Sequence, residues 1–446
     1  MKTRSRLISR TTLLVALAAA LVAVAGCGGG SSDSAGTGRI ATPGAAPKAP
    51  VTITIWHTNV DVAAKTLRKI ADSFEAKNPN ITVKTEQGAP ADQILTKLTT
   101  VLSTNDYPDI AYVFGTDTPA LARSNKLVEL TKVVNDPKFS WDDFYGAERE
   151  VATVGGRVVA LPALVDNLAV VYNKTVFKEA GVAPPSPDWS WDDYRAAAKK
   201  LTNPAKKVFG TMYPVSGDED TVWRFWPMIW QQGGKDISAD GKTAPFDGPE
   251  YKKALELLRA MAIDDKSVYT DTNSDAIYSL FANNKIGMVV TGPFALSGFD
   301  EAKTDYGVVQ LPAFDGDHQT VSGPDNWIVL DKGDDRVAAS VAFLSYLASP
   351  EQDAVWSVGL GNMPIRNGTQ KTAAWKNAAA TNPAFQTFAN NFVNAKKKRP
   401  QTIAYPAYSL ALGEQIAAVL TGQSSVDDAL AAAKTNAEAA LADAGG

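Results

Sequence analysis

The first folded part of the chain alternates between strand and helix patterns. Val51–Trp56 is a β-branched run typical of a strand, and apolar residues recur with helical spacing from Leu67 to Phe74. Asn78-Pro79-Asn80 breaks that helix, and Ile81–Thr85 follows as a second strand. Strands that alternate with helices predict a mostly parallel sheet with helices on both faces.

The pattern changes further along the chain. Gln93–Leu102 repeats the helical period and Asp109–Phe114 is a short buried strand, whereas Val158–Leu161 and Leu168–Tyr172 resemble two strands paired around Pro162. From there to Ala262 the expected helices are longer and rich in Trp, which indicates a second lobe. Three strands and two alanine-rich helical stretches are expected in the remainder: Ile286–Val290, Tyr306–Val309, Trp327–Leu330, Ala338–Val358 and Tyr408–Ala444.

The N-terminus has the pattern of an export signal. Four basic residues precede an apolar run from Leu13 to Ala25 that is too short to cross a bilayer as a stable helix. Val24-Ala25-Gly26-Cys27 resembles the lipobox of bacterial lipoproteins, in which the cysteine is lipidated and the chain is cut just before it. We therefore expect residues 1–26 to be a signal peptide and Cys27, the only cysteine, to be a membrane anchor.

Composition describes the rest of the chain. Residues 27–50 are rich in Gly, Ser, Ala and Pro, which predicts a flexible tether. Removal of residues 1–26, with four basic and no acidic side chains, changes the formal net charge from −4 to −8, which argues against a nucleic-acid partner. With 45% hydrophobic residues, the chain can bury a large core, and its 446 residues predict two domains.

Motifs of catalysis are missing from the sequence. His57 and His318 are far apart without metal-type spacing, and there is no P-loop, nucleophile elbow or dinucleotide fingerprint. We expect neither enzymatic activity nor a metal or other cofactor. A secreted carbohydrate-active hydrolase or lyase is the alternative, because Asp117 and Asp166 could act as paired acids. A structural cell-envelope lipoprotein is a third class, in which no ligand would change tryptophan fluorescence.

The order of segments resembles the carbohydrate-type extracellular solute-binding proteins of ABC importers. The resemblance covers nearly all of Val51–Leu441, and no one segment decides it, but all occur in the family's order. They are IADSFEAKNPNITV, YPDIAYVF, ALPALVDNLAVVYNKTVFKEAGV, PSPDWSWDDYRAAAKKLT, FWPMIWQQGG, KIGMVVTGPFALSGF, FLSYLASPEQDAVW, GNMPIRNG and LTGQSSVDDALAAA.

The resemblance implies a two-lobed α/β periplasmic-binding-protein-like fold. Each lobe is then a mostly parallel sheet flanked by helices, and hinge strands join the lobes around a ligand cleft. We expect an N-terminal lobe of residues 51–165 plus 291–331 and a C-terminal lobe of 166–290 plus 332–446. The chain is expected to pass between lobes near Asp166, Val290 and Asp331.

Aromatic residues are the first candidates for ligand contacts, because a sugar presents apolar C–H faces that stack on aromatic rings. Trp223, Trp226 and Trp230 share one helical face, and a plain core stripe is the alternative. The resemblance matches Trp223 to an aromatic that stacks on sugar and Trp226 to a buried structural tryptophan. Phe294 resembles the aromatic of a ligand-stacking turn, with a plain hydrophobic turn as the alternative. Tyr405 and Tyr408 compete for another position near the cleft, and we favour Tyr408.

Polar candidates follow the expected strands. The family places a ligand-binding acid at Asp166, with Asn167 beside it, and the alignment leaves Asp117 and Thr116 as rivals for a second position; Asp117 is also a good helix cap. Thr58, Asn59 and Asp61 follow the first strand, at the end where open α/β sheets bind ligands. Three further candidates each have a structural alternative, a turn for Asn326, core burial for Trp327 and an ion pair for Arg366. Lys396–Arg399 is interpreted as a solvated helix end.

The expected function is ligand capture for transport. The chain is predicted to be a monomeric, membrane-tethered substrate-binding component of an ABC importer that holds a mono- or oligosaccharide in its cleft. Its partners would be the sugar, the permease subunits and, through Cys27, the outer face of the cell membrane.

Overall fold

A computed structural model describes residues 38–59 and 61–445. The predicted signal segment and Cys27 lie outside the described residues. The strands are β1 (Val51–His57), β2 (Ile81–Gln87), β3 (Ile110–Phe114), β4 (Thr153–Val154), β5 (Arg157–Val158), β6 (Leu161–Asp166), β7 (Ala169–Asn173), β8 (Thr211–Pro214), β9 (Val268–Asp271), β10 (Met288–Thr291), β11 (Tyr306–Val309), β12 (Thr320–Val329) and β13 (Ala395–Lys398).

The helices begin and end at local signals. Ser190 and Asp193, for example, form a reciprocal capping box at the start of α7. The helices are α1 (Asp61–Lys77), α2 (Ile94–Leu102), α3 (Thr118–Leu121), α4 (Thr131–Val134), α5 (Gly146–Val151), α6 (Lys174–Ala180), α7 (Trp191–Leu201), α8 (Glu219–Trp223), α9 (Trp226–Trp230), α10 (Pro249–Arg259), α11 (Ser274–Ala282), α12 (Leu296–Glu301), α13 (Asp334–Leu347), α14 (Pro350–Leu360), α15 (Ala373–Thr381), α16 (Pro383–Asn391), α17 (Tyr405–Leu420) and α18 (Val426–Gly445).

The larger sheet has six strands. β1 pairs in parallel with β2 and β3, as the strand and helix pattern predicts. β12 joins the sheet antiparallel to β3 and β6 and pairs in parallel with β13. All ten residues of β12 are buried. The central sheet is therefore mostly parallel, and β12 is its longest strand and is buried along its whole length.

The smaller sheet has three strands around β7. β10 and β11 both run antiparallel to β7, whereas a separate pair, β8 and β9, is parallel. The predicted pairing around Pro162 is wrong, because Val158 pairs with Thr153 and β6 pairs with β12 instead of β7. β5, β6 and β7 thus belong to three different sheets, and the partners of β6 and β7 lie far along the chain.

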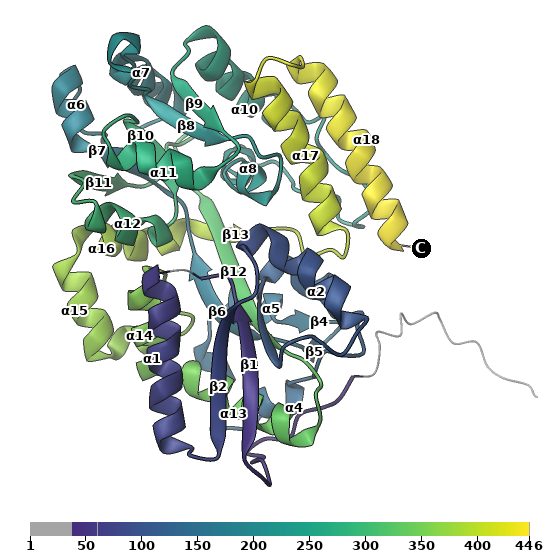
Figure 1. Cartoon of the computed structure of the whole chain (residues 1–446). Coiled ribbons are helices and arrows are strands. Elements are labelled where there is room, and N and C mark those ends of the chain that lie inside the picture. The colour runs from purple at the N-terminus through teal and green to yellow at the C-terminus, as the bar shows by residue number, and fades with distance from the viewer. Residues whose placement is uncertain (1–37, 60, 446) are drawn as a thin grey trace, which may run out of the picture. The chain divides into compact units, whose positions relative to one another are not determined.

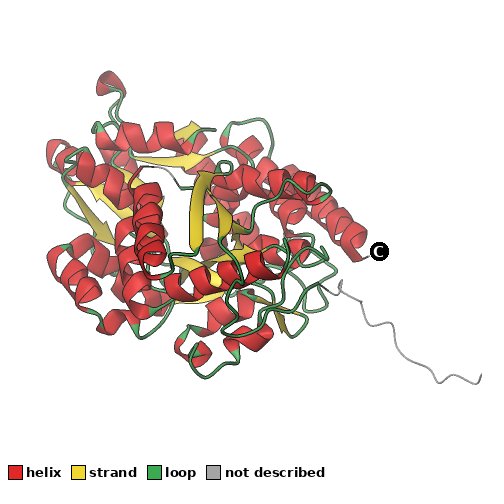
Figure 2. Ribbon diagram, turned by 60° about the horizontal axis from the view of Figure 1, so that its bottom comes forward, coloured by secondary structure: helices red, strands yellow, loops and turns green. Residues whose placement is uncertain are grey.

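Apolar side chains on both faces of each sheet define two lobes. The large-sheet lobe packs β1 against α1, α13 and α14, with α2 on the opposite face. The small-sheet lobe packs β7 against α7 to α10, α17 and α18 on one face and against α11, α12, α15 and α16 on the other. In Figure 1 the small sheet lies above the large one. Figure 2 shows helices on either side of the strands.

The predicted lobe boundaries need two corrections. The crossing near Val290 is wrong, because β10 and β11 both belong to the small sheet, so the chain passes to the large sheet only after β11. The crossing near Asp331 is also wrong, because β12 and α13 share the core of the large-sheet lobe. The passage near Asp166 agrees with the structure, since β6 pairs in the large sheet and β7 in the small one.

The predicted tether ends before Pro50. Ala41 is buried, and its backbone N–H donates to the carbonyl oxygen of Glu129 at 2.9 Å. Arg39 forms an ion pair with Asp331, with Nε and Oδ1 2.8 Å apart. The segment from Arg39 onward therefore packs on the large-sheet lobe, although its composition predicts a free linker.

Candidate ligand cleft

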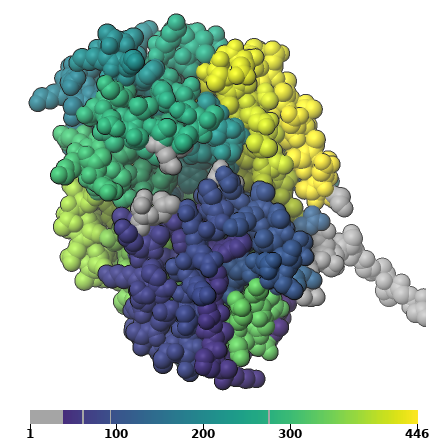
Figure 3. Space-filling model, viewed as in Figure 1, coloured from purple at the N-terminus to yellow at the C-terminus, as the bar shows by residue number. Residues whose placement is uncertain are grey.

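A cleft of about 860 Å³ lies between the two lobes. Figure 3 shows the seam where the purple and blue elements of the large-sheet lobe meet the teal elements of the small-sheet lobe. The large-sheet lobe contributes Thr58, Asn59, Tyr112, Phe114, Asp166, Asp325 and Asn362, and the small-sheet lobe contributes Asp218, Glu219, Trp223, Arg224, Tyr278 and Phe294. The structure thus brings together five of the predicted site residues, Thr58, Asn59, Asp166, Trp223 and Phe294.

Trp223 lies at the end of α8 and lines the cleft. Its indole Nε1 is buried without a hydrogen-bond partner among the described residues. The guanidinium carbon of Arg399 lies 4.7 Å from the centroid of the ring, in cation–π contact. Trp226, in contrast, is fully buried in the small-sheet lobe, and its Nε1 donates to Tyr405 Oη at 3.1 Å. The two tryptophans are therefore separated as predicted, one toward the cleft and one in the core.

Arg399 is the centre of a buried ionic network in the wall of the cleft. Its Nη1 lies 3.2 Å from Glu219 Oε1, and its Nη2 lies 3.4 Å from Asp325 Oδ1. Burial lowers the pKa of Arg399, but the two carboxylates outweigh burial and raise the pKa overall. Tyr112 Oη donates to Asp325 at 2.5 Å. Arg399 is thus held charged and fixed in place against the Trp223 ring.

Asp166 combines burial with an unused acceptor. Its Oδ2 accepts a hydrogen bond from Asn362 Nδ2 at 3.0 Å, whereas its Oδ1 is buried and has no partner among the described residues. Burial raises the pKa of Asp166 well above its ordinary value, and the nearby carboxylate of Asp325 raises it further. Asn59 Nδ2, also in the cleft, is a buried donor that likewise has no partner there. Because buried polar groups normally find partners, both atoms indicate a ligand or water position.

The described lining of the cleft is acidic. It includes two guanidiniums, Arg224 and Arg399, and six carboxyl side chains, Asp166, Asp218, Glu219, Asp220, Glu301 and Asp325. Both guanidiniums have partners within the protein, and among the described residues only Nε of Arg399 is a buried guanidinium donor in this lining without a partner. Arg224 Nε donates to the carbonyl oxygen of Val290 at 2.8 Å, its Nη2 donates to Tyr278 Oη at 3.0 Å, and its Nη1 pairs with Asp220. The cleft therefore offers an anion little unpaired positive charge.

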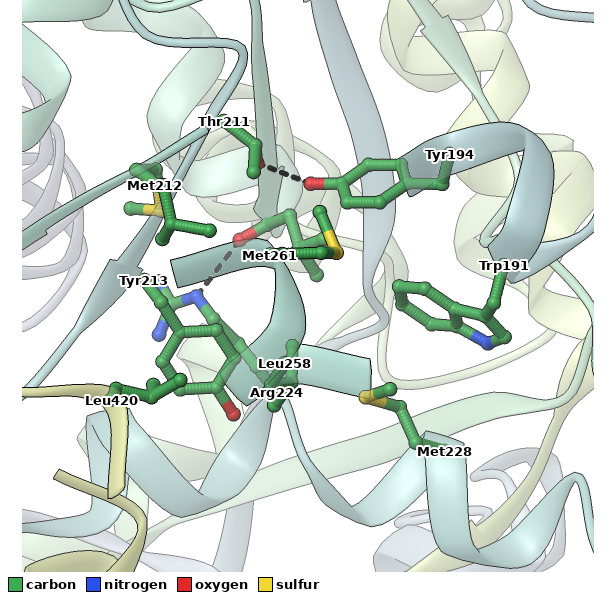
Figure 4. A pocket seen from close by; sticks show the side chains of 12 residues that line it. Trp191, Tyr194, Thr211, Met212, Tyr213, Arg224, Met228, Leu258, Met261 and Leu420 are labelled. Carbon is green, nitrogen blue, oxygen red and sulfur yellow. Dashed lines mark hydrogen bonds between the residues drawn. The ribbon is translucent and has the colours of Figure 1, made fainter. Parts of the chain in front are cut away.

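A small enclosed cavity lies on the other side of Arg224. Its volume is about 20 Å³, enough for about one water position. Figure 4 shows Arg224 bonded toward the strand that carries Val290, and Tyr194 bonded to Thr211 across the cavity. Three methionines, Met212, Met228 and Met261, also line it. The cavity is too small for a solute, and Arg224 is anchored beside it by its bond to Val290.

Phe294 and the loop after β1 lie at the mouth of the cleft. Phe294 follows Gly292-Pro293, as its predicted turn requires, and is 39% exposed. Thr58 and Asn59 follow β1, at the expected end of the strand. The side chain of Asp61 lies outside the described part of the structure.

Besides Asp117, five predicted site residues do not line the cleft. Asn167 is buried and donates to the carbonyl oxygen of Phe388, and Asn326 is buried and donates to Thr118 Oγ1. Trp327 is 2% exposed in the core of the large-sheet lobe. Arg366 pairs with Asp143, with Nε and Oδ2 2.7 Å apart, and Tyr408 Oη donates to the carbonyl oxygen of Asp236. The structural alternatives hold for Trp327 and Arg366, and all five side chains serve packing or internal bonding.

Neither rival for the second acidic position lines the cleft. Thr116 and Asp117 are both buried in the turn after β3, and burial raises the pKa of Asp117 to about 7. Tyr405, the rival of Tyr408, is also buried, and its Oη donates to Glu219 at 3.0 Å. Asp117 and Asp166, the two acids that the sequence suggests as a hydrolytic pair, therefore do not share the cleft.

The buried ionic network around Arg399 was not foreseen from the sequence. Lys396–Arg399 is not a solvated helix end, because Lys396, Lys397 and Lys398 lie in β13 and Arg399 is 2% exposed. The partners of Arg399 are 180 and 74 residues away along the chain. No local pattern marks such a residue, since a short basic run is usually exposed.

The described residues were also searched for a metal site and for a membrane-spanning helix. Within the described residues, no group of three or more His, Cys, Asp and Glu side chains is arranged to hold a metal ion. Among the same residues, none of the helices is both long and apolar enough to span a membrane.

The chain is similar to known proteins in both sequence and fold. The family model for bacterial extracellular solute-binding proteins matches residues 59–354. The sn-glycerol-3-phosphate-binding periplasmic protein UgpB of Escherichia coli (strain K12) is 23% identical over 406 residues, which cover 86% of this chain and 91% of that protein. The crystal structure of the cyclic α-maltosyl-1,6-maltose binding protein from Arthrobacter globiformis is 28% identical with a TM-score of 0.74, covering 88% of this chain and all of that one.

A second solved structure is closer in shape but more distant in sequence. UgpB from Mycobacterium tuberculosis, in complex with glycerophosphocholine, has a TM-score of 0.80 at 17% identity, over 88% of this chain and 99% of that one. At this identity the likeness concerns the fold alone. The family model, in contrast, matches most of the chain. The chain therefore belongs to the family of bacterial extracellular solute-binding proteins.

Proposed function

We propose that the chain is the substrate-binding component of an ABC importer and captures a neutral mono- or oligosaccharide in the cleft. One observation carries the choice of ligand. Asp166 Oδ1 is an unpartnered acceptor, whereas Asn59 Nδ2 and Trp223 Nε1 are unpartnered donors, all in the lining of one cleft. A sugar hydroxyl both donates and accepts, so a polyol can satisfy such a mixed set, and the Trp223 ring offers its apolar surface to a sugar face.

The charge of the cleft separates this proposal from a phosphate ester. Relatives of the chain include proteins that bind sn-glycerol 3-phosphate. A phosphate group is recognised by cations with free donors, but in this acidic lining Arg224 is committed to internal partners, and Arg399, paired with Glu219 and Asp325, keeps only its buried Nε without a partner. The cleft therefore favours a ligand without negative charge.

We infer binding without catalysis. The acid pair named for the hydrolase alternative is not assembled, because Asp166 lines the cleft and Asp117 does not. The names of the relatives describe binding proteins. Incubation with oligosaccharides should accordingly yield no products.

The proposed location is the outer face of the cell membrane, with Cys27 as the lipidated N-terminal residue and the chain acting as a monomer beside its permease. The support is the basic, apolar and small-residue pattern of residues 1–27. Cys27→Ala should release a folded, ligand-competent domain from the membrane. An unmodified Cys27 within a longer native chain, detected by mass spectrometry, would rule the anchor out.

A thermal-shift screen tests the ligand class. Maltose, trehalose, cellobiose and xylobiose should be compared with sn-glycerol 3-phosphate and glycerophosphocholine. A ligand at 100 times its dissociation constant adds about 2.7 kcal/mol to the free energy of unfolding. We expect at least one neutral sugar to raise the melting temperature and neither phosphate ester to do so. A shift with a phosphate ester and none with the sugars would overturn the proposal.

A further inference from the structure

Gly323 lies directly against the ring of Trp223. A Cβ atom built on Gly323 would lie 2.1 Å from Trp223 Cη2 and 2.5 Å from Cζ3. Carbon atoms in contact are about 3.5 to 4 Å apart, so any side chain at this position would force the ring to move. The far edge of the indole therefore rests on the bare backbone of β12.

Space, and not backbone conformation, is what requires glycine here. Gly323 is not among the described glycines with a positive φ. At such a position alanine normally stabilises a protein, because it restricts the unfolded chain more than glycine does. Retaining glycine in a fully buried strand thus has a cost in stability that only the neighbouring ring explains.

The position of this contact connects it to the cleft. Gly323 is the register partner of Asp166, across β12 and β6. The same ring is in contact with the Arg399 guanidinium, which Glu219 and Asp325 hold in place. The indole is thereby fixed at two points, at its far edge by Gly323 and over its plane by Arg399, next to the strand pair that carries the unpartnered carboxylate oxygen.

We propose that Gly323 is a positioning residue for ligand binding: its lack of a side chain lets the Trp223 ring settle on β12 and sets the distance between the ring and Asp166. The step from position to affinity rests on the proposed function above. A methyl group at position 323 displaces the Trp223 ring. The ring and Asp166 Oδ1 are then no longer at the spacing that lets both contact one ligand.

The position of the ring can be tested without a ligand. The chain has ten tryptophans, so protein labelled with 5-fluorotryptophan gives several ¹⁹F resonances, and the one lost in Trp223→Phe identifies Trp223. Gly323→Ala should shift that resonance. Gly146→Ala is the matched control, because a Cβ at Gly146 meets nothing within 4 Å, and it should leave the resonance in place. An unshifted Trp223 resonance in Gly323→Ala overturns the proposal.

A double-mutant cycle tests the effect on binding, with the sugar from the panel that raises the melting temperature most. Gly323→Ala alone should weaken binding by about tenfold, which corresponds to about 1.4 kcal/mol. In a Trp223→Phe background, where the clashing ring atoms are gone, Gly323→Ala should cost little more. An equal loss in both backgrounds overturns the proposal. If no sugar binds the parent protein, the proposed function fails, and the ¹⁹F shift still decides whether Gly323 positions the ring.

Discussion

Trp223 and Trp226 are three residues apart but depend on different surroundings. Trp223→Ala removes a cleft aromatic, and truncation of such a residue typically costs on the order of 2 kcal/mol of binding, or about 30-fold in dissociation constant. Trp226→Ala empties a core position and should cost about 3–5 kcal/mol of folding free energy. Calorimetric titration and thermal unfolding of both variants separate the two effects. Normal binding with early melting in Trp223→Ala would contradict the assignment.

Asp117 should make stability depend on pH. Its pKa is about 7 in the folded protein, against about 3.9 in an unfolded chain, so between these values the folded state retains a proton that the unfolded state has lost. Stability therefore falls as pH rises from about 4 to 7, by at most about 1.4 kcal/mol per pH unit for this group, and the loss is complete above pH 7.

The variant Asp117→Asn isolates this contribution. Urea denaturation at pH 5 to 8 should show that the stability of the variant relative to the parent protein rises from pH 5 to pH 7 and is larger at pH 8 than at pH 5. Burial also raises the pKa of Asp353 to about 7, so part of the slope should remain in the variant. Parallel curves for parent and variant would mean that Asp117 is ionised throughout the range.

Single residues are predictable from sequence when their neighbours along the chain decide their environment. Thr58 and Asn59 follow a recognisable strand, and Phe294 follows a Gly-Pro turn, so their place at the cleft could be foreseen. Arg366 could not be placed, because Asp143, which binds it, is 223 residues away. The buried position of Arg399 could not be predicted for the same reason, because its partners Glu219 and Asp325 are also far away along the chain.

At the scale of elements, one ion pair fastens α13 to the large sheet. Asp109, fully buried before β3, accepts a hydrogen bond from the Thr54 backbone N–H at 2.7 Å and pairs with Arg336 of α13. Arg336→Ala leaves that carboxylate buried with one of its partners gone; loss of one member of a fully buried pair costs about 3–5 kcal/mol, and the partial exposure of Arg336 places this case at or below the lower end of that range. Chemical denaturation should reveal a loss of about 3 kcal/mol.

An exposed ion pair supplies the control. Arg259 and Asp264 are both largely exposed, so Arg259→Ala should change stability by less than about 1 kcal/mol. Equal losses in the two variants would show that Arg336 acts as an ordinary surface residue.

Elements were easier to predict than their pairing. Apolar periodicity located the strands and helices between Val51 and Phe114, because each pattern is local. It could not reveal that β7 pairs antiparallel with β10 and β11, since strand runs carry no mark of their partners. The lobe boundaries at Val290 and Asp331 failed for the same reason.

At the scale of the whole molecule, we predict that ligand draws the two lobes together by hinge motion. The cleft is lined from both lobes, and the chain passes between the sheets from β6 to β7 and from β11 to β12. Small-angle scattering should show a smaller radius of gyration with a bound sugar, and a smaller decrease for Trp223→Ala at the same sugar concentration, because that variant binds more weakly. An unchanged radius in a sample that calorimetry shows to be saturated would exclude closure.

The complete burial of β12 also bears on how new specificities can evolve. All ten residues of this strand are buried: Gly323 lies against the Trp223 ring, Asp325 pairs with Arg399, and Trp327 fills the core. A substitution there alters folding and recognition together, so few are tolerated. Thr58, Asn59 and Phe294 lie on loops and a turn at the rim, where changes leave the core intact. We therefore expect divergence in ligand preference to accumulate at the rim while β12 stays nearly invariant.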